Sequence, residues 1–244
     1  MEALFEAVEK TVAATPTERD LTRHFEAIAE LTAIFREAVI NHLRGGPDGN
    51  GWRQARRFAE RLRAIEEAVD QMEAREKISP MLVPLLGGSA PVLCGVLRVL
   101  REMRRQVTGF AIESGFTDHE RRVPEYLVPM LQDLTDQVCA AVDALVDTCR
   151  PVLLRGSAWA PGDSANAVSW YESQADRVSM QLLRTIFADE ALSLEAKLPL
   201  AQVVEEIDSI ADCAEDIDRE LRRRLHEDLV PAALYSPGAV CAAH

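Results

Sequence analysis

The sequence is poor in aromatic residues and in positive charge. Aromatics make up only 5% of its 244 residues, and 27 Lys and Arg stand against 40 Asp and Glu, which gives a net charge of −13. Because nucleic-acid phosphates require a basic protein surface, this balance excludes a typical nucleic-acid-binding protein. The charge is compatible with binding of cations or with docking on a basic protein surface.

The sequence also lacks an apolar segment of the length of about 18 residues that spans a bilayer. Its most apolar stretch, ISPMLVPLLGGSAPVLCGVL, is interrupted by three prolines and two adjacent glycines. The N-terminus, MEALFEAVEK, has neither the basic region nor the apolar region of a signal peptide. These absences predict a cytoplasmic protein that meets the inner face of the membrane only peripherally, through a protein partner and without insertion.

The cysteines show no C-x-x-C spacing, are odd in number and mostly lie in apolar helical surroundings, which predicts reduced core thiols. They are Cys94, Cys139, Cys149, Cys213 and Cys241.

The composition favours helices packed on helices. Apolar residues make up 48% of the chain, Ala, Leu, Glu and Arg are frequent, and the apolar positions recur at i, i+3 and i+4. The fold class is therefore predicted to be all-α, with no strand. The pattern predicts a short helix within residues 1–14 and six long helices over about 18–44, 51–76, 91–113, 121–155, 163–188 and 193–229.

A hydrophilic segment near residue 117 divides these helices into two halves. Residues 1–117 are expected to form a first three-helix bundle with the short N-terminal helix, residues 118–230 a second three-helix bundle, and residues 231–244 a loosely held tail. The middle helix of each half carries an E-x-x-x-D pair, Glu66 with Asp70 and Glu172 with Asp176, which indicates a weak internal duplication.

The third helix of the second half adds a ladder of acids. Asp208, Asp212 and Asp216 recur at a spacing of four, which stacks their carboxylates along one side of a helix about 6 Å apart. A short turn before residue 193 should make the last two helices antiparallel, and a rise of about 1.5 Å per residue then brings Glu172 and Asp176 level with Asp208 and Asp212. These positions lie at the edge of the apolar stripes or away from them, which predicts a surface groove.

Such a groove offers hard oxygen ligands suited to Fe, Mn, Mg or Ca. The absence of an E-x-x-H motif argues against a buried di-iron centre of the ferritin type. Two alternatives remain open at this point. The acids could be only a solvated helix face, and Glu66 and Asp70 could pair with Arg98, Arg101 and Arg105 on the next helix instead of binding a metal.

The segments ESQAD (172–176), DSIADCAED (208–216) and EEAVD (66–70) resemble the E/D-x-x-x-D signature of PhoU-like proteins. The closer branch is that of the accessory proteins, or phosphate transport regulators, of Pit-type phosphate transporters. The resemblance implies an elongated pair of up-and-down three-helix bundles and a surface metal site, with iron as the first choice. The matching ligands are Glu172, Asp176, Asp208, Asp212 and Asp216, whereas arginines replace acids on the third helix of the first half.

The resemblance further implies a non-enzymatic regulator of inorganic phosphate uptake that docks on a membrane phosphate transporter or its regulator. Self-association is left open. Two rival hypotheses are a metal-free helical interaction scaffold and a metal-dependent phosphohydrolase. The hydrolase would need a general base or a group that binds the substrate phosphate near the metal, and only Arg177 and Arg219 are close candidates.

Overall fold

The computed structural model describes residues 16–45, 50–78, 90–116, 123–155 and 166–234, and these residues form six α-helices and no strand, which confirms the predicted fold class. The predicted helix within 1–14 and the last ten residues of the predicted tail lie outside the described residues. The helices are α2 (Pro16–Gly45), α3 (Asn50–Ile78), α4 (Ala90–Phe116), α5 (Val128–Arg155), α6 (Ala167–Ala188) and α7 (Leu194–Leu234).

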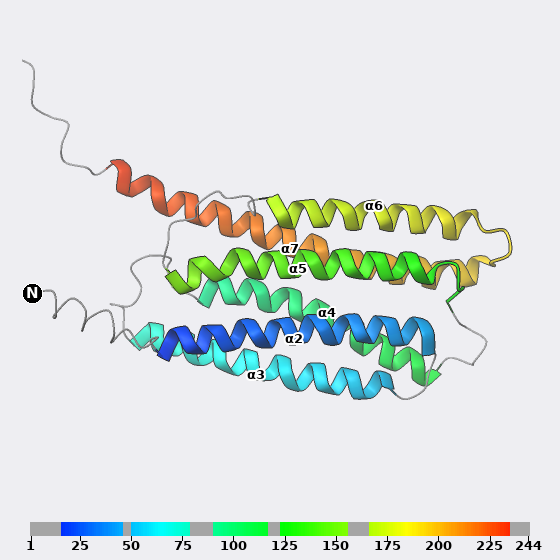
Figure 1. Cartoon of the computed structure of the whole chain (residues 1–244), viewed down its shortest axis with the longest axis horizontal. Helices are drawn as coiled ribbons and strands as arrows, with labels where there is room; N and C mark the ends of the chain where they lie inside the picture. Colours follow the sequence, from blue (N-terminus) through cyan, green and yellow to red (C-terminus); the bar gives the residue numbers. More distant parts are fainter. Residues whose placement is uncertain (1–15, 46–49, 79–89, 117–122, 156–165, 235–244) are drawn as a thin grey trace, which may run out of the picture.

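Successive helices run in opposite directions along one long axis (Figure 1). Helices α2, α3 and α4 pack on one another, and so do α5, α6 and α7. The two sets also meet directly, because α2 packs against α5 and α4 packs against α7. The boundary predicted near residue 117 falls in a connection outside the described residues.

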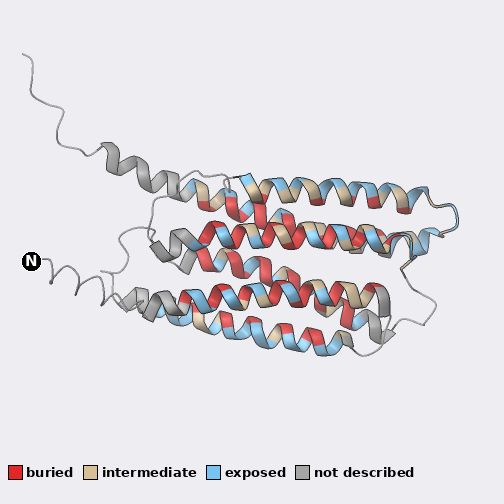
Figure 2. Ribbon diagram, in the orientation of Figure 1, coloured by how far each residue is buried: buried red, intermediate tan, exposed pale blue. Residues whose placement is uncertain are grey.

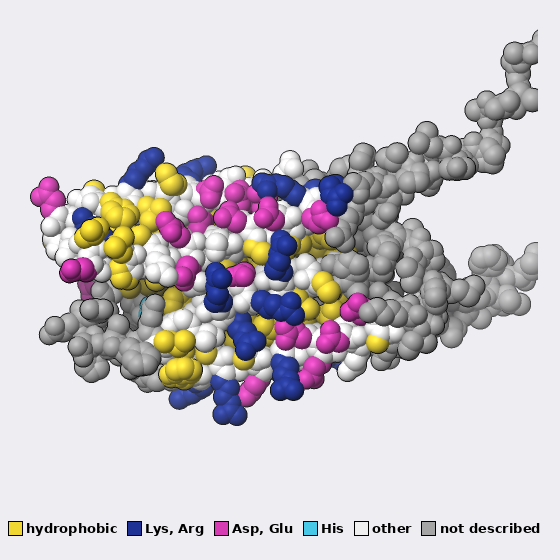
Figure 3. All heavy atoms as spheres, turned by 180° about the vertical axis from the view of Figure 1, so that it is seen from behind, with side chains coloured by type: hydrophobic (Ala, Val, Ile, Leu, Met, Phe, Trp, Pro, Cys, Tyr) yellow, Lys and Arg dark blue, Asp and Glu magenta, His cyan; other side chains and the backbone are white. Residues whose placement is uncertain are grey.

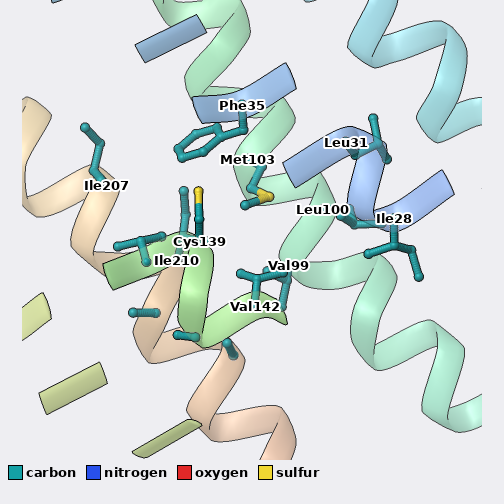
Figure 4. Close-up of a cluster of buried hydrophobic side chains, with 14 of the residues drawn as sticks. Ile28, Leu31, Phe35, Val99, Leu100, Met103, Cys139, Val142, Ile207 and Ile210 are labelled. Atoms are coloured by element: carbon teal, nitrogen blue, oxygen red, sulfur yellow. The ribbon is translucent and has the colours of Figure 1, made fainter. Parts of the chain in front are cut away.

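Each helix turns an apolar stripe inward, and Figure 2 shows the buried residues following these inner faces. In α6 the buried positions are spaced by three, four or seven residues, the spacing that keeps them on one side of a helix. One continuous core joins both halves. Figure 4 shows the point where α2, α4, α5 and α7 meet, with side chains such as Phe35, Met103, Val142 and Ile210 drawn together.

Two of the helix ends that differ from the predicted positions lie close to prolines. Helix α5 begins at Val128 instead of residue 121, because Pro124 disfavours helical geometry in the residue before it, and a turn in which the Leu127 N–H donates to the Pro124 carbonyl at 2.9 Å comes first. Helix α7 continues past Pro231 to Leu234. A proline in the last turn removes one backbone hydrogen bond but leaves the preceding turns intact.

No helix among the described residues combines the length and the hydropathy needed to cross a bilayer. Of the cysteines, Cys139 and Cys149 are buried as predicted, and burial raises the pKa of both thiols to about 12. Cys94 is exposed, which corrects the expectation that it is a core thiol. Cys241 lies outside the described residues.

Candidate metal centre

Three carboxylates from α6 and α7 meet at the surface of the second half. Glu172 and Asp176 of α6 and Asp212 of α7 each offer an oxygen, and these oxygens lie within 4.8 Å of one another. Glu172 is half-buried and the two aspartates are exposed. Because oxygens bound to one hard cation at about 2.0–2.6 Å can lie up to about 5 Å apart, this spacing suits a single ion.

The α6–α7 connection fixes the level at which these acids meet. The Ala196 N–H donates to the Ser193 side-chain oxygen at 3.3 Å and caps the first turn of α7. Across the connection, Lys197 Nζ donates to the Phe187 carbonyl at 2.9 Å. A short, hydrogen-bonded turn leaves little freedom in the register of two antiparallel helices. The prediction that Glu172 and Asp176 lie level with Asp212 is confirmed by the approach of their oxygens.

Asp208 lies at the inner edge of the cluster. Its Oδ2 accepts a hydrogen bond from Ser179 Oγ at 2.7 Å, and its Oδ1 is buried without a hydrogen-bond partner. Burial raises the pKa of this carboxyl to about 6, Ser179 opposes the shift, and Asp176 and Asp212 add to it. The sequence predicted that Asp208 lies away from the apolar stripe, in a surface groove, whereas the structure makes it half-buried.

Asp216 is oriented differently from the other predicted ligands. Its Oδ1 accepts from Arg219 Nη1 at 3.1 Å, and it does not belong to the three-carboxylate group. Arg219 also forms an ion pair with Glu215, a buried residue whose Oε1 accepts from Ser169 Oγ at 2.8 Å. Glu215 was missed from the sequence because only the four-residue ladder was considered. The sequence pattern that could have identified Glu215 is its position three residues after Asp212, on the same side of the helix.

The cluster carries more negative charge than its surroundings compensate. Burial raises the pKa of Glu172, and the neighbouring Glu215 and Asp176 raise it further. Burial also raises the pKa of Asp212, together with Asp176, Asp216 and Glu215, while Arg219 acts in the opposite direction. A bound cation would relieve this repulsion, so the residues present fit a metal ion.

The first half has an ion pair at the corresponding place. Glu66 of α3 accepts from Arg101 Nε of α4 at 2.9 Å, which confirms the prediction that an arginine can pair with this acid. Arg105 forms a further ion pair with Glu102 at 3.0 Å on α4. The positive charge that a metal would supply in the second half is therefore supplied by side chains here.

No family model matches the chain. It is similar to the UPF0111 protein PH1389 of Pyrococcus horikoshii, with 27% identity over 209 residues that span 82% of this chain and 91% of that protein. Among solved structures it resembles a PhoU-like protein of Shewanella oneidensis MR-1, with a TM-score of 0.67, 14% identity and coverage of 86% of this chain and 99% of the other.

A second Shewanella oneidensis MR-1 structure, described as a PhoU-like phosphate regulatory protein, gives a TM-score of 0.61 at 15% identity over 88% of this chain and 99% of the other. Both likenesses extend over nearly the whole of each chain, and together they show that this chain has the PhoU-like fold.

Proposed function

We propose that the protein is a metal-binding regulator of inorganic phosphate uptake. It acts on the cytoplasmic side by docking on a membrane phosphate transporter, of the Pit type, or on the regulator of such a transporter. The main support for the metal site is the convergence of Glu172, Asp176 and Asp212 beside the half-buried Asp208. The link to phosphate is supported by the PhoU-like fold and by the phosphate regulatory protein that shares it.

The ion would be held by Glu172, Asp176 and Asp212. We propose Asp208, whose Oδ1 has no hydrogen-bond partner, as a further ligand. All of these are carboxylate oxygens, the ligands that hard cations prefer. Iron is the first choice from the family resemblance, followed by Mn, Mg or Ca. In the regulator, the bound charge would neutralise the cluster and hold α6 against α7.

The hydrolase hypothesis is disfavoured by the contacts of the two nearest arginines. Arg177 donates to the side-chain oxygen of Gln174 at 2.9 Å, and Arg219 is shared between Glu215 and Asp216. Binding of a substrate phosphate would require Arg219 to break two ion pairs, one of them to a buried carboxylate.

Metal content tests the site and separates it from a metal-free scaffold. We expect protein purified without chelator to contain metal by elemental analysis. Asp208→Ala with Asp212→Ala should remove the metal and keep the helical circular dichroism, because neither side chain belongs to the apolar core. The matched control is Glu66→Ala with Asp70→Ala, which should leave metal content unchanged. The assignment would be rejected if the wild-type protein contained no metal. It would also be rejected if only the Glu66→Ala, Asp70→Ala variant lost its metal.

Phosphate uptake tests the regulatory role. In cells that lack the gene, uptake of inorganic phosphate should change, and wild-type protein should restore it. The Asp208→Ala, Asp212→Ala protein, present at the same level, should fail to restore it if the metal is needed for regulation. Uptake that is the same with and without the gene would rule out the proposed function.

A further inference from the structure

Large apolar side chains lie exposed at the end of the molecule where α6 turns into α7. Leu194 is 63% exposed, Leu198 54% and Phe187 49%, and Tyr126, just before α5, is 49% exposed. We call these four residues the turn patch. Figure 3 shows hydrophobic side chains gathered at this end of one face, next to acidic ones. Isolated exposed apolar residues are ordinary, but a group of them often marks a binding surface.

Hydrogen bonds hold the turn patch in place. The Tyr126 hydroxyl donates to Asp189, which also accepts the Ala191 N–H at 2.7 Å and so closes the turn. Lys197 ties the start of α7 to the Phe187 carbonyl at 2.9 Å. The apolar side chains therefore project from a preorganised support, which lowers the ordering cost of binding a partner.

The rim of the turn patch is negative. Glu190 and Glu195 are exposed within and just after the turn, and neither forms an ion pair with any residue that the structure describes. The segment 187–198 carries the acids Asp189, Glu190 and Glu195 against the single base Lys197, so its net charge is −2. A partner that fits must combine apolar side chains with positive charge.

The two connections beside the turn patch do not offer such a cover. The connections outside the described residues at this end of the molecule, 46–49 and 117–122, read GPDG and TDHERR and contain no Leu, Ile, Val, Met, Phe or Trp. Helix α7 ends at the opposite end (Figure 1), and its 41 residues span about 60 Å.

A second copy and a lipid surface fit less well than a basic partner. A symmetric dimer through the turn patch would bring Glu190 and Glu195 of both copies together in a chain of net charge −13. Anionic lipid headgroups would be repelled by the same charges.

We infer that the turn patch is the docking surface for a basic amphipathic segment, in which apolar anchors at helical spacing are flanked by Lys and Arg. Leu194 and Leu198 lie one helical turn apart and present neighbouring side chains to such anchors. Cytoplasmic loops of membrane proteins carry an excess of Lys and Arg, so the partner that we propose for phosphate regulation could supply this segment. The inference rests on that proposed function for the partner and does not depend on the metal site.

A synthetic helical peptide of about 14 residues, with Leu along one face and Lys elsewhere, serves as the probe. Its control has the same composition with the Leu positions scattered around the helix. At about 150 mM salt, which limits binding by net charge alone, fluorescence anisotropy should show the full chain binding the amphipathic peptide at least about tenfold more tightly. Leu194→Gln with Leu198→Gln should abolish this preference.

The matched control variant is Trp170→Gln, because Trp170 is 55% exposed near the other end of α6 and should not contribute. Unchanged circular dichroism verifies that the variants fold. Equal binding of the two peptides, or an equal loss in the Trp170 variant, would overturn the inference. It would also be overturned if the Leu variant abolished self-association in sedimentation, or binding to phosphatidylcholine vesicles, without affecting peptide binding.

The two proposals fail in different measurements. Absence of peptide preference in a protein that holds metal and changes phosphate uptake rejects the turn patch alone. Uptake that does not respond to the gene rejects the proposed function, whatever the peptide does.

Discussion

Asp208 places a carboxylate where water solvates it poorly. One oxygen is bonded to Ser179 and the other is buried without a partner, and burial raises the pKa to about 6. The folded protein therefore binds a proton here more strongly than the unfolded chain does. This group adds stability at low pH, and the contribution is lost as the pH rises through about 6.

Asp208→Asn should stabilise the metal-free protein at pH 7.5, because the amide resembles the protonated acid and its oxygen can still accept from Ser179. We expect a gain of about 1 kcal/mol in urea unfolding with a chelator present, and this gain should fade as the pH falls from about 6 to about 4. Asp216→Asn is the control, since Asp216 is exposed and paired with Arg219. A loss of stability in the Asp208 variant at pH 7.5 would contradict this account.

His42 responds to pH in the opposite direction. Its ring stacks on Phe110 with centroids 4.4 Å apart, and burial lowers the pKa to about 4. The unfolded imidazole takes up a proton near pH 6.5, whereas the folded one stays neutral, so stability falls as the pH drops from about 6.5 to about 4.

His42→Phe should remove this contribution while keeping an aromatic ring against Phe110. We expect the wild-type protein to lose up to about 2 kcal/mol more than the variant between pH 7 and pH 4. Guanidinium unfolding at a series of pH values measures the difference. Parallel pH profiles for the two proteins would show that His42 titrates normally in the folded state.

At the scale of the helices, the apolar periodicity was sufficient to predict all six described elements. The ends at Val128 and Leu234 were missed because prolines act through local geometry that a stripe does not encode. In the site, the four-residue spacing and the short turn predicted that Glu172 and Asp176 would lie level with Asp212.

The remainder of the site depends on features that spacing alone does not determine. The angle at which α6 packs on α7 decides that Asp208 is half-buried, and this angle follows from the side chains between the helices. The orientation of Asp216 depends on Arg219, which pairs with both Glu215 and Asp216. The burial of Asp208 and the orientation of Asp216 therefore depend on the packed structure and not on the order of residues along one helix.

The contact between α4 and α7 requires a glycine. A Cβ placed on Gly95 would lie 2.9 Å from Ile217 Cγ2, closer than side chains normally approach. A β-branched side chain in a helix has little freedom to turn away. Gly109, in the same helix, has open space around the same position.

Gly95→Ala should therefore destabilise the protein by about 1–3 kcal/mol, whereas Gly109→Ala should stabilise it by about 0.5–1 kcal/mol through helix propensity. Thermal unfolding of both variants tests the contrast. In the background of Ile217→Ala, the penalty for Gly95→Ala should disappear, because the opposing methyl group is absent. Equal effects of the two glycine substitutions would show that α4 and α7 do not approach closely at Gly95.

At the scale of the whole molecule, the two halves are joined by apolar packing, by an ion pair and by a cation–π contact. The core runs without interruption through α2, α4, α5 and α7. Arg36 of α2 pairs with Asp136 of α5 at 2.8 Å, and the Arg150 guanidinium lies 5.2 Å from the centre of the Phe25 ring. Separating the halves would expose this core, so neither half can unfold without removing the packing partner of the other.

We therefore expect the described part of the chain to unfold in a single cooperative transition, although the candidate metal site belongs to the second half alone. A metal that binds only the folded state at 100 times its Kd adds about 2.7 kcal/mol. For a chain of this size, that raises Tm by roughly 5–10 °C. Because the halves share a core, calorimetry should show the whole transition moving upward with added metal. The Asp208→Ala, Asp212→Ala protein should show one transition that no longer responds to metal. Two transitions, of which metal moves only one, would mean that the two bundles fold independently and that the sequence boundary near residue 117 is a true domain boundary.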